Sequence, residues 1–301
     1  QYYDNPGTGE ARAVAIADLN GDGRADVVAG TKTNTNQGKV EVWWGDGSGA
    51  FTHSASLDVY TATGEVRSVA VVDMNADGYP DIVSCAWFGK ELSWWENPGR
   101  KGGAWKKHMI EEGMNVEFAF LVDLNGDGKA LEVLPQFGGP KAIVAWYELK
   151  GGQFVKHLVS DKFSGHGIGA GDVNGDGKID VLGPKGWYEA PDWKYHPDWD
   201  SKEALSFLHV MDVNGDKRND VIAGNAHGYG LFWFEQGADG KFTRHTIDDT
   251  WSQAHAVTLV DLNGDGKKDI VTGKRWMAHE HEEGAKDPNG LYWYETLMVP
   301  H

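Results

Sequence analysis

Residues 256–272 read AVTLVDLNGDGKKDIVT: a short apolar run, an acidic turn containing two glycines, and a second apolar run. Such β-branched runs on either side of a turn are typical of paired strands, so the segment predicts a hairpin with an acidic connection. The underlying string, Asp-x-Asn-x-Asp, recurs at intervals of 40 to 55 residues. Its six copies begin at Asp18, Asp73, Asp123, Asp172, Asp212 and Asp261.

Each repeat carries two more strand signals after the hairpin. An aromatic run comes first, as in LYWYE (291–295), and a fourth run follows, as in FTRHTI (242–247). Four strands in 40 to 50 residues match one propeller blade. We therefore predict one all-β domain over residues 1–301, a six-bladed β-propeller closed by pairing of the N- and C-terminal strands. Seven blades are the alternative.

One histidine per repeat falls in or near the fourth run, which supports the six-fold division. These histidines are His53, His108, His157, His196, His245 and His301.

This pattern resembles the FG-GAP/VCBS repeat family of calcium-loop propellers, and the resemblance covers essentially the whole chain. The segment GHGIGAGDVNGDG (165–177) is also similar to one in bacterial sugar-utilisation propellers of this family. A related propeller occurs in aldos-2-ulose dehydratases, which eliminate water from sugars. The resemblance is specific for the fold, and it assigns no catalytic residue here.

The acidic loops offer closely spaced oxygen ligands of the kind that Ca²⁺ prefers. Five loops have an Asp at the ninth position, whereas the third has Leu131 there and Glu132 one step later, so we expect the third site to be weakest. In the fifth loop Lys217 replaces the turn glycine. Alternatively, these side chains bond only to their own turns. The expected ligands are Asp18, Asn20, Asp22, Asp26; Asp73, Asn75, Asp77, Asp81; Asp123, Asn125, Asp127; Asp172, Asn174, Asp176, Asp180; Asp212, Asn214, Asp216, Asp220; Asp261, Asn263, Asp265 and Asp269.

The net charge of −17 argues against a nucleic-acid partner, whose phosphates would be repelled. No apolar run approaches the length of a membrane helix. Calcium sites with incomplete ligand sets need the millimolar calcium found outside cells. We therefore expect a secreted, periplasmic or cell-surface protein, and the start at Gln1 suggests a processed mature form.

Polar residues recur six positions before each loop Asp, on the face opposite the acidic loops. We expect them to form a ring at the mouth of the central channel: Arg12, Arg67, Glu117, His166, Ser206 and His255. Loops after the second strand of each repeat add to this face with Lys32, Trp87, Lys185, His227, Lys274, Arg275, Trp276, His279 and His281. Rim residues of this kind can also be merely solvated.

The leading functional hypothesis is a carbohydrate lyase or dehydratase that acts by β-elimination. Its expected bases are His166 and His255, and the cations that neutralise the acid are Arg67, Lys185, Lys274 and Arg275. Arg12, Glu117, Trp87 and Trp276 would bind substrate, and His227 and His279 are candidate ligands of one transition metal such as Zn²⁺ or Mn²⁺. The alternative is a calcium-stabilised lectin or adhesion module without catalysis.

Overall fold

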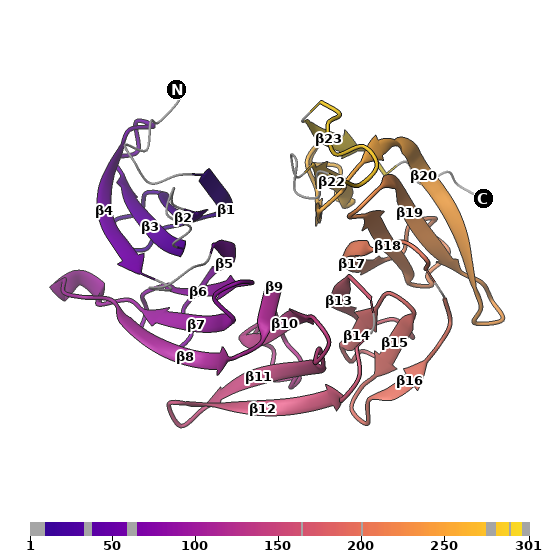
Figure 1. Cartoon of the computed structure of the whole chain (residues 1–301), viewed down its shortest axis with the longest axis horizontal. Helices are drawn as coiled ribbons and strands as arrows, with labels where there is room; N and C mark the ends of the chain where they lie inside the picture. Colours follow the sequence, from indigo (N-terminus) through magenta and orange to yellow (C-terminus); the bar gives the residue numbers. More distant parts are fainter. Residues whose placement is uncertain are drawn as a thin grey trace. The chain divides into compact units, whose positions relative to one another are not determined.

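The repeat seen in the sequence folds as an antiparallel meander of strands (Figure 1). The structure is a computed structural model, and it describes residues 10–32, 38–58, 65–163, 165–199, 201–274, 281–288 and 290–296. These residues fall into two compact units, Gln1–Phe163 and Ser164–His301, which are considered separately. In the described ranges no helix is long and apolar enough to span a membrane, and the helix present is the short η1 (Gly99–Lys101).

Unit 1 contains three four-stranded sheets, each a simple meander. The first holds β1 (Glu10–Ala17), β2 (Asp26–Lys32), β3 (Gly38–Gly45) and β4 (Phe51–Asp58). The second holds β5 (Val66–Val72), β6 (Asp81–Ala86), β7 (Glu91–Glu96) and β8 (Lys106–Glu112). The third holds β9 (Asn115–Val122), β10 (Glu132–Gly138), β11 (Val144–Lys150) and β12 (Gln153–Ser160).

Unit 2 contains an eight-stranded sheet and a three-stranded sheet. The larger sheet joins two meanders through parallel pairing of β13 with β17. The first meander is β13 (Ile168–Gly171), β14 (Asp180–Gly183), β15 (Gly186–Glu189) and β16 (Lys194–His196). The second is β17 (Leu205–Met211), β18 (Asp220–Asn225), β19 (Tyr229–Gln236) and β20 (Phe242–Ser252). The smaller sheet is β21 (Ala256–Val260), β22 (Asp269–Gly273) and β23 (Leu291–Tyr294).

The chain is thus an all-β protein with the strand arrangement of a propeller, as the sequence predicts. The residues expected to close the last blade, 1–9 and 297–301, lie outside the described ranges. The count of six closed blades therefore stays a prediction.

The core lies between successive sheets, where apolar side chains of one meander pack on the next. In unit 1, Val28 and Val42 of the first sheet cluster with Val66 and Ile82 of the second. In unit 2, Leu231 and Ile222 cluster with Val257 and Ile270 of the smaller sheet. Face-to-face packing of this kind is why the strands are apolar on both sides.

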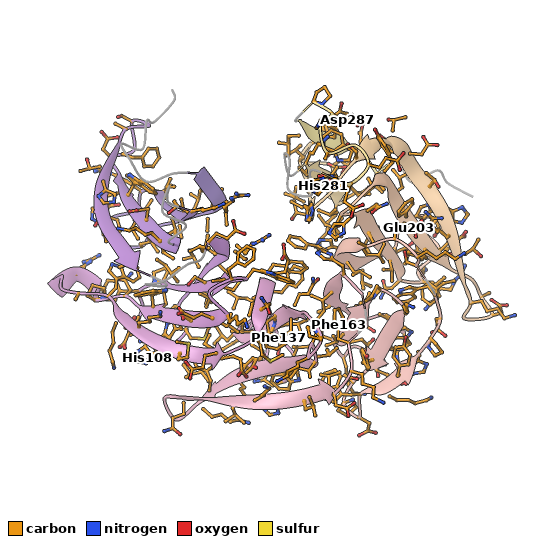
Figure 2. The ribbon with its side chains drawn as sticks, in the orientation of Figure 1. His108, Phe137, Phe163, Glu203, His281 and Asp287 are labelled. Atoms are coloured by element: carbon orange, nitrogen blue, oxygen red, sulfur yellow. The ribbon has the colours of Figure 1, made fainter. Side chains whose placement is uncertain are left out.

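Histidines of the outer strands stack on tryptophans of the third strands. The ring of His108 on β8 (Figure 2) lies 4.2 Å from that of Trp94, and its Nε2 is 2.7 Å from Glu96. The same tryptophan, histidine and glutamate pattern recurs on β12, β16 and β20, through His157, His196 and His245. These histidines belong to the repeat itself, and His301 lies outside the described residues.

Candidate functional site

The acidic loops are held by their own backbone amides. In the first loop, Asp18 Oδ1 accepts hydrogen bonds from the N–H groups of Gly21 (2.8 Å) and Asp22 (3.1 Å). Its Oδ2 accepts one from Gly23 (2.7 Å). Desolvation acts to raise the pKa of Asp18, but these amide donors together outweigh it and lower the pKa. The same contacts recur at Asp123, Asp172, Asp212 and Asp261.

The turn conformation of these loops needs a left-handed residue at the sixth position. Glycine fills it in most loops, as at Gly23 with φ of 84°. Lys217 takes the position in the fifth loop with φ of 70°, and its N–H still bonds to Asp212 Oδ2 at 2.9 Å. The fifth loop therefore keeps the turn despite its missing glycine.

In the five loops with aspartate at the ninth position, that residue connects the hairpin to the end of the third strand. Asp26 is fully buried, and its carboxylate accepts hydrogen bonds from the N–H groups of Leu19 (2.8 Å) and Gly45 (2.9 Å). Asp81 makes the equivalent bonds to Met74 and Asn97. Burial raises the pKa of Asp81 to about 6, although its backbone donors act to lower it. These carboxylates therefore have a clear structural role.

The third loop makes part of this arrangement with a glutamate, whose Oε1 accepts from Asn125 Nδ2 of the same loop at 2.9 Å. Glu132 pairs with Val122 in the register that Asp26 takes opposite Ala17. Its Oε2 accepts the N–H of Leu124 at 3.0 Å. The longer side chain thus recovers the bond to the loop backbone that Asp26 makes to Leu19.

The oxygen atoms at the first, third and fifth loop positions fit a hard cation. They are carboxylate and amide oxygens on exposed turns, the donor set that Ca²⁺ takes. Because the amide network alone also satisfies much of each loop, calcium binding stays a prediction. When bound, the ion would neutralise closely spaced carboxylates.

An asparagine in several loops also connects to the outer strand, a link the sequence analysis missed. Asn214 Nδ2 donates to Glu235 Oε1 at 3.0 Å, and Glu235 Oε2 is 2.8 Å from His245 Nε2. Asn125 makes the same link to Glu148. The glutamate that follows five of the six aromatic runs was the available signal.

The predicted rim residues of unit 1 form a chain of buried ion pairs. Arg67 pairs with Glu65 and, through Nη1, with Glu117 Oε1 at 2.9 Å. Arg12 Nε lies 3.5 Å from Glu65 Oε2. The sequence analysis missed Glu65, which bridges the two arginines. Arg67 and Glu117 thus neutralise each other in this unit.

Trp87 lies beside these ion pairs, and the guanidinium carbon of Arg67 is 5.9 Å from the centroid of its ring. Its ring also covers Gly138, where a Cβ would come within 2.2 Å of it. The neighbouring Phe88 is 60% exposed. Of these two aromatic side chains, Phe88 is therefore the more accessible to a ligand.

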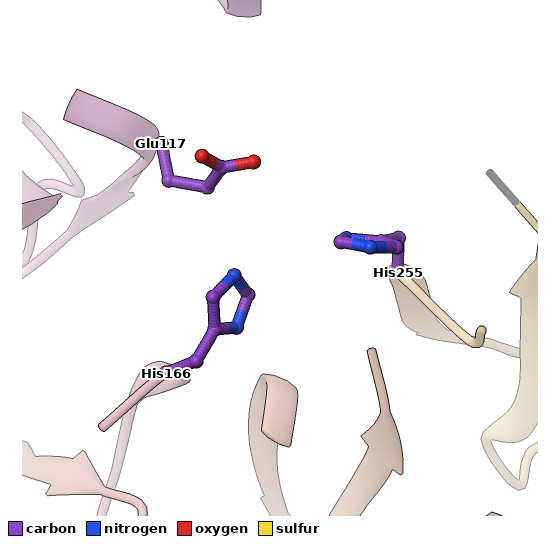
Figure 3. A group of neighbouring side chains, drawn as sticks. All are labelled: Glu117, His166 and His255. Carbon is purple, nitrogen blue, oxygen red and sulfur yellow. The ribbon is translucent and has the colours of Figure 1, made fainter. Parts of the chain in front are cut away.

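Three histidines of unit 2 lie together. The ring centroids of His166 and His227 are 4.9 Å apart, those of His227 and His255 5.7 Å, and those of His166 and His255 5.9 Å. Figure 3 shows the rings of His166 and His255 directed toward the same space, and one nitrogen of each lies within 4.8 Å of the other. The sequence predicted all three as functional residues, although it gave His227 a different partner.

Local contacts position the ring of His166 and the backbone that carries the other two rings. His166 Nδ1 lies 2.6 Å from the carbonyl oxygen of Leu205. Gly167 has φ of 112°, and a Cβ there would lie 2.8 Å from that same oxygen, so this close approach needs glycine. The loops of His227 and His255 are tied by the N–H of Ala254, which donates to Asn225 O at 2.9 Å.

Three other predicted residues of unit 2 differ from one another in burial and in hydrogen bonding. Lys274 Nζ donates to Ser252 Oγ (2.9 Å) and to the carbonyl oxygens of Gly284 and Asp287, so it anchors the segment 281–288. Desolvation lowers its pKa. Lys185 is exposed, and Ser206 is buried with its Oγ 3.2 Å from the N–H of Gly224. Arg275, Trp276 and His279 lie outside the described residues.

His209 lies on β17. Its Nε2 is 2.7 Å from the carbonyl oxygen of Val257, and burial lowers its pKa. His209 therefore joins two strands and stays outside the trio. The expected ring of six polar residues spans both units and stays a prediction.

A family model described as the FG-GAP-like repeat matches residues 18–84 and 212–272. Within these two ranges the chain carries FG-GAP-like repeats. The matched ranges include the first, second, fifth and sixth acidic loops. These four loops are therefore part of the repeat that defines the fold. No curated protein matches the sequence.

The structure of this chain also resembles solved structures of other proteins. A protein from Lactobacillus plantarum is 12% identical, with a TM-score of 0.59 over 89% of this chain and 78% of that chain. The V. cholerae biofilm matrix protein Bap1 is 18% identical, with a TM-score of 0.48 over 85% of this chain. This chain spans 42% of that Bap1 chain. At these identities the likeness concerns the fold alone.

Proposed function

We propose that this protein is a carbohydrate lyase or dehydratase whose reaction centre is the trio of His166, His227 and His255. The observation that carries the proposal is the 4.9 to 5.9 Å spacing of the three rings, which come from three separate loops. Imidazoles are polar, so packing alone gives little reason to gather three of them. Their convergence in one unit supports a single centre over a site repeated in every blade.

The proposed reaction removes a proton from the carbon beside a carboxylate or carbonyl group of the sugar. The electron pair of the C–H bond becomes a C=C bond, and the oxygen substituent on the next carbon leaves with the electron pair of its C–O bond and takes up a proton. Negative charge builds on the carboxylate or carbonyl oxygen during this step. The proton would pass to the unprotonated ring nitrogen of His166 or His255, and the imidazolium so formed would stabilise that oxygen.

The fixed orientation of His166 supports such a role. Because a carbonyl oxygen only accepts, the contact with Leu205 requires that Nδ1 carry the ring hydrogen when the ring is neutral. The lone pair is then on Nε2. That lone pair is what proton transfer or metal coordination needs.

The test is to incubate the protein with uronate-containing oligosaccharides and with keto-sugars. Unsaturated products are detected by the absorbance of the new C=C bond. We expect turnover by the unaltered chain and its loss in His166→Ala and His255→Ala. His245→Gln is the matched control, because that histidine is on the outer strand β20 and pairs with Glu235. Sugar binding without any product would favour the lectin or adhesion alternative, for which the exposed Phe88 offers a stacking surface.

We also propose six blades closed by the two chain ends, and a secreted, periplasmic or cell-surface location. Six acidic loops at regular spacing support the blade count, and their oxygen ligands suit the millimolar calcium outside cells. Deleting residues 1–9 should lower the melting temperature if the terminal strands pair. An unchanged melting temperature would count against closure.

A further inference from the structure

We propose that His166, His227 and His255 together bind one divalent transition-metal ion, of which Zn²⁺ is the type. The proposal concerns the same trio as the proposed reaction but does not depend on it, because metal binding is measured without any sugar. It replaces the pairing of His227 with His279 that the sequence suggested. The three rings and their supporting contacts all belong to unit 2.

The spacing of the rings suits three ligands of one ion. With a Zn–N distance of about 2.05 Å, an imidazole centroid lies about 3.2 Å from the metal, so two rings at a tetrahedral angle have centroids about 5.2 Å apart. The observed separations of 4.9, 5.7 and 5.9 Å bracket that value. Coordination of one ion would require the rings to rotate until one nitrogen of each points to a common position; one nitrogen of His166 and one of His255 already lie within 4.8 Å of each other.

The contact of His166 with Leu205 is the outer support that a metal-binding histidine needs. Its Nδ1–H donates to the backbone carbonyl oxygen at 2.6 Å, which fixes the neutral tautomer and leaves Nε2 as the ligand atom. Histidines that bind metals usually donate their other ring N–H to a carbonyl or carboxylate in this way. A ring held only by packing would not require this tautomer.

The backbone that carries the other two rings is also held in place. The N–H of His227 donates to Asn225 Oδ1 at 3.1 Å, and Asn225 Nδ2 donates to Tyr229 O at 3.1 Å. The N–H of Gln253, two residues before His255, donates to Gly228 O at 2.7 Å. Such fixed loops reduce the entropy lost when three ligands are ordered around an ion.

The ligand atoms select the class of metal. Imidazole nitrogens suit zinc, copper, nickel and iron, whereas calcium and magnesium take oxygen ligands. The acidic loops supply oxygen and the trio supplies nitrogen, so the two kinds of site would load with different ions. Three histidines leave a fourth position open, which is typical of catalytic metal sites.

The experiment is a titration of the untagged chain with Zn²⁺ and, separately, with Co²⁺, in excess Ca²⁺ so that the oxygen sites are occupied. We expect one tight equivalent of Zn²⁺ per chain. With Co²⁺ we expect the visible absorption of a four- or five-coordinate ion with nitrogen ligands. A purely six-coordinate spectrum, or no stoichiometric uptake of Zn²⁺ or Co²⁺, would overturn the proposal.

Single substitutions identify the ligands. His166→Ala, His227→Ala and His255→Ala should each weaken Zn²⁺ binding at least about tenfold, since even the loss of an outer partner costs that much. His245→Gln should bind as the unaltered chain does. Circular dichroism and thermal unfolding show whether each variant is folded. If a variant does not fold, the Co²⁺ spectrum of the unaltered chain still tests the site. Unchanged affinity in all three folded variants would refute the assignment. Metal uptake without turnover would leave this proposal standing and reject the elimination reaction. Turnover by a chain that takes up no Zn²⁺ or Co²⁺ would reject this proposal and leave the reaction standing.

Discussion

The Nδ1–H of His166 donates to the backbone carbonyl oxygen of Leu205 at 2.6 Å, across 39 residues of sequence. Gly167 allows this approach, because a Cβ at that position would lie 2.8 Å from the same oxygen. The orientation of a predicted functional ring therefore depends on a neighbouring glycine.

Gly167→Ala should displace His166 and lower the free energy of unfolding. The loss should exceed the roughly 1–2 kcal/mol that an alanine in a left-handed conformation costs by itself. Urea denaturation measures the loss, and the Zn²⁺ titration should show weaker binding. Gly128→Ala is the matched control, because Gly128 has φ of 86° and no atom within 4 Å of an added Cβ. Equal losses in the two variants would mean that the contact with Leu205 has no steric consequence.

Asp26→Ala should destabilise unit 1 by about 2–4 kcal/mol, because two buried N–H groups would lose their acceptor. Those groups belong to Leu19 and Gly45. The measurement is equilibrium unfolding in a chelator, so that no cation contributes. Asp22→Ala, at an exposed position of the same loop, serves as the comparison. A smaller effect for Asp26 than for Asp22 would be inconsistent with the structural role of the buried carboxylate.

Removal of calcium should lower the melting temperature, because an ion bound only to the folded chain stabilises it by about 2.7 kcal/mol per site at a hundredfold excess over its Kd. Differential scanning calorimetry at several Ca²⁺ concentrations checks this, with Mg²⁺ as the control ion. Asp261→Ala should reduce the number of ions bound. If Ca²⁺ leaves the melting temperature unchanged, the loops are held by their amides alone.

Arg67→Leu should cost about 3–5 kcal/mol, because breaking a buried ion pair leaves charge without compensation. Glu65 and Glu117 are 3% and 9% exposed, and both pair with Arg67. Thermal unfolding of Arg67→Leu and of Arg67→Leu/Glu117→Leu makes the comparison. The double variant should recover part of the loss. No recovery would indicate that Arg67 acts through packing on Trp87 and Phe88.

The repeat could be predicted from the sequence because each acidic loop lies between two apolar runs at a fixed distance. The ninth aspartate is a different case. It was predicted as a calcium ligand, yet its carboxylate bonds to an amide at the end of the third strand, such as Gly45, 19 residues away. Spacing within a loop carries no information about that partner. In the third loop Glu132 takes the place of this aspartate in the strand register. The numbering of the loop alone did not show whether Glu132 could do so.

The site was predictable in part. Register placed His166 and His255 six residues before their loop aspartates, and the loop after the second strand of its repeat placed His227 on the same face. The contact among the three rings depends on how the loop after β18 packs against the segment before β21, through Asn225 and Ala254. Glu65 lies eight residues before its loop aspartate, where the first repeat also has an acid, Glu10, but the other four repeats do not. The repeat pattern therefore gave only a weak signal for it.

The parallel pairing of β13 with β17 has a consequence for how this chain evolved. Gly169 and Gly171 make it possible, since a Cβ at either would overlap Leu208 or Val210 of β17. Repeats joined only by apolar packing can be duplicated or lost singly, because each keeps its own main-chain hydrogen bonds. These two repeats share such bonds, so a gene rearrangement that separated them would leave two unpaired strand edges. They are therefore expected to be inherited as a pair.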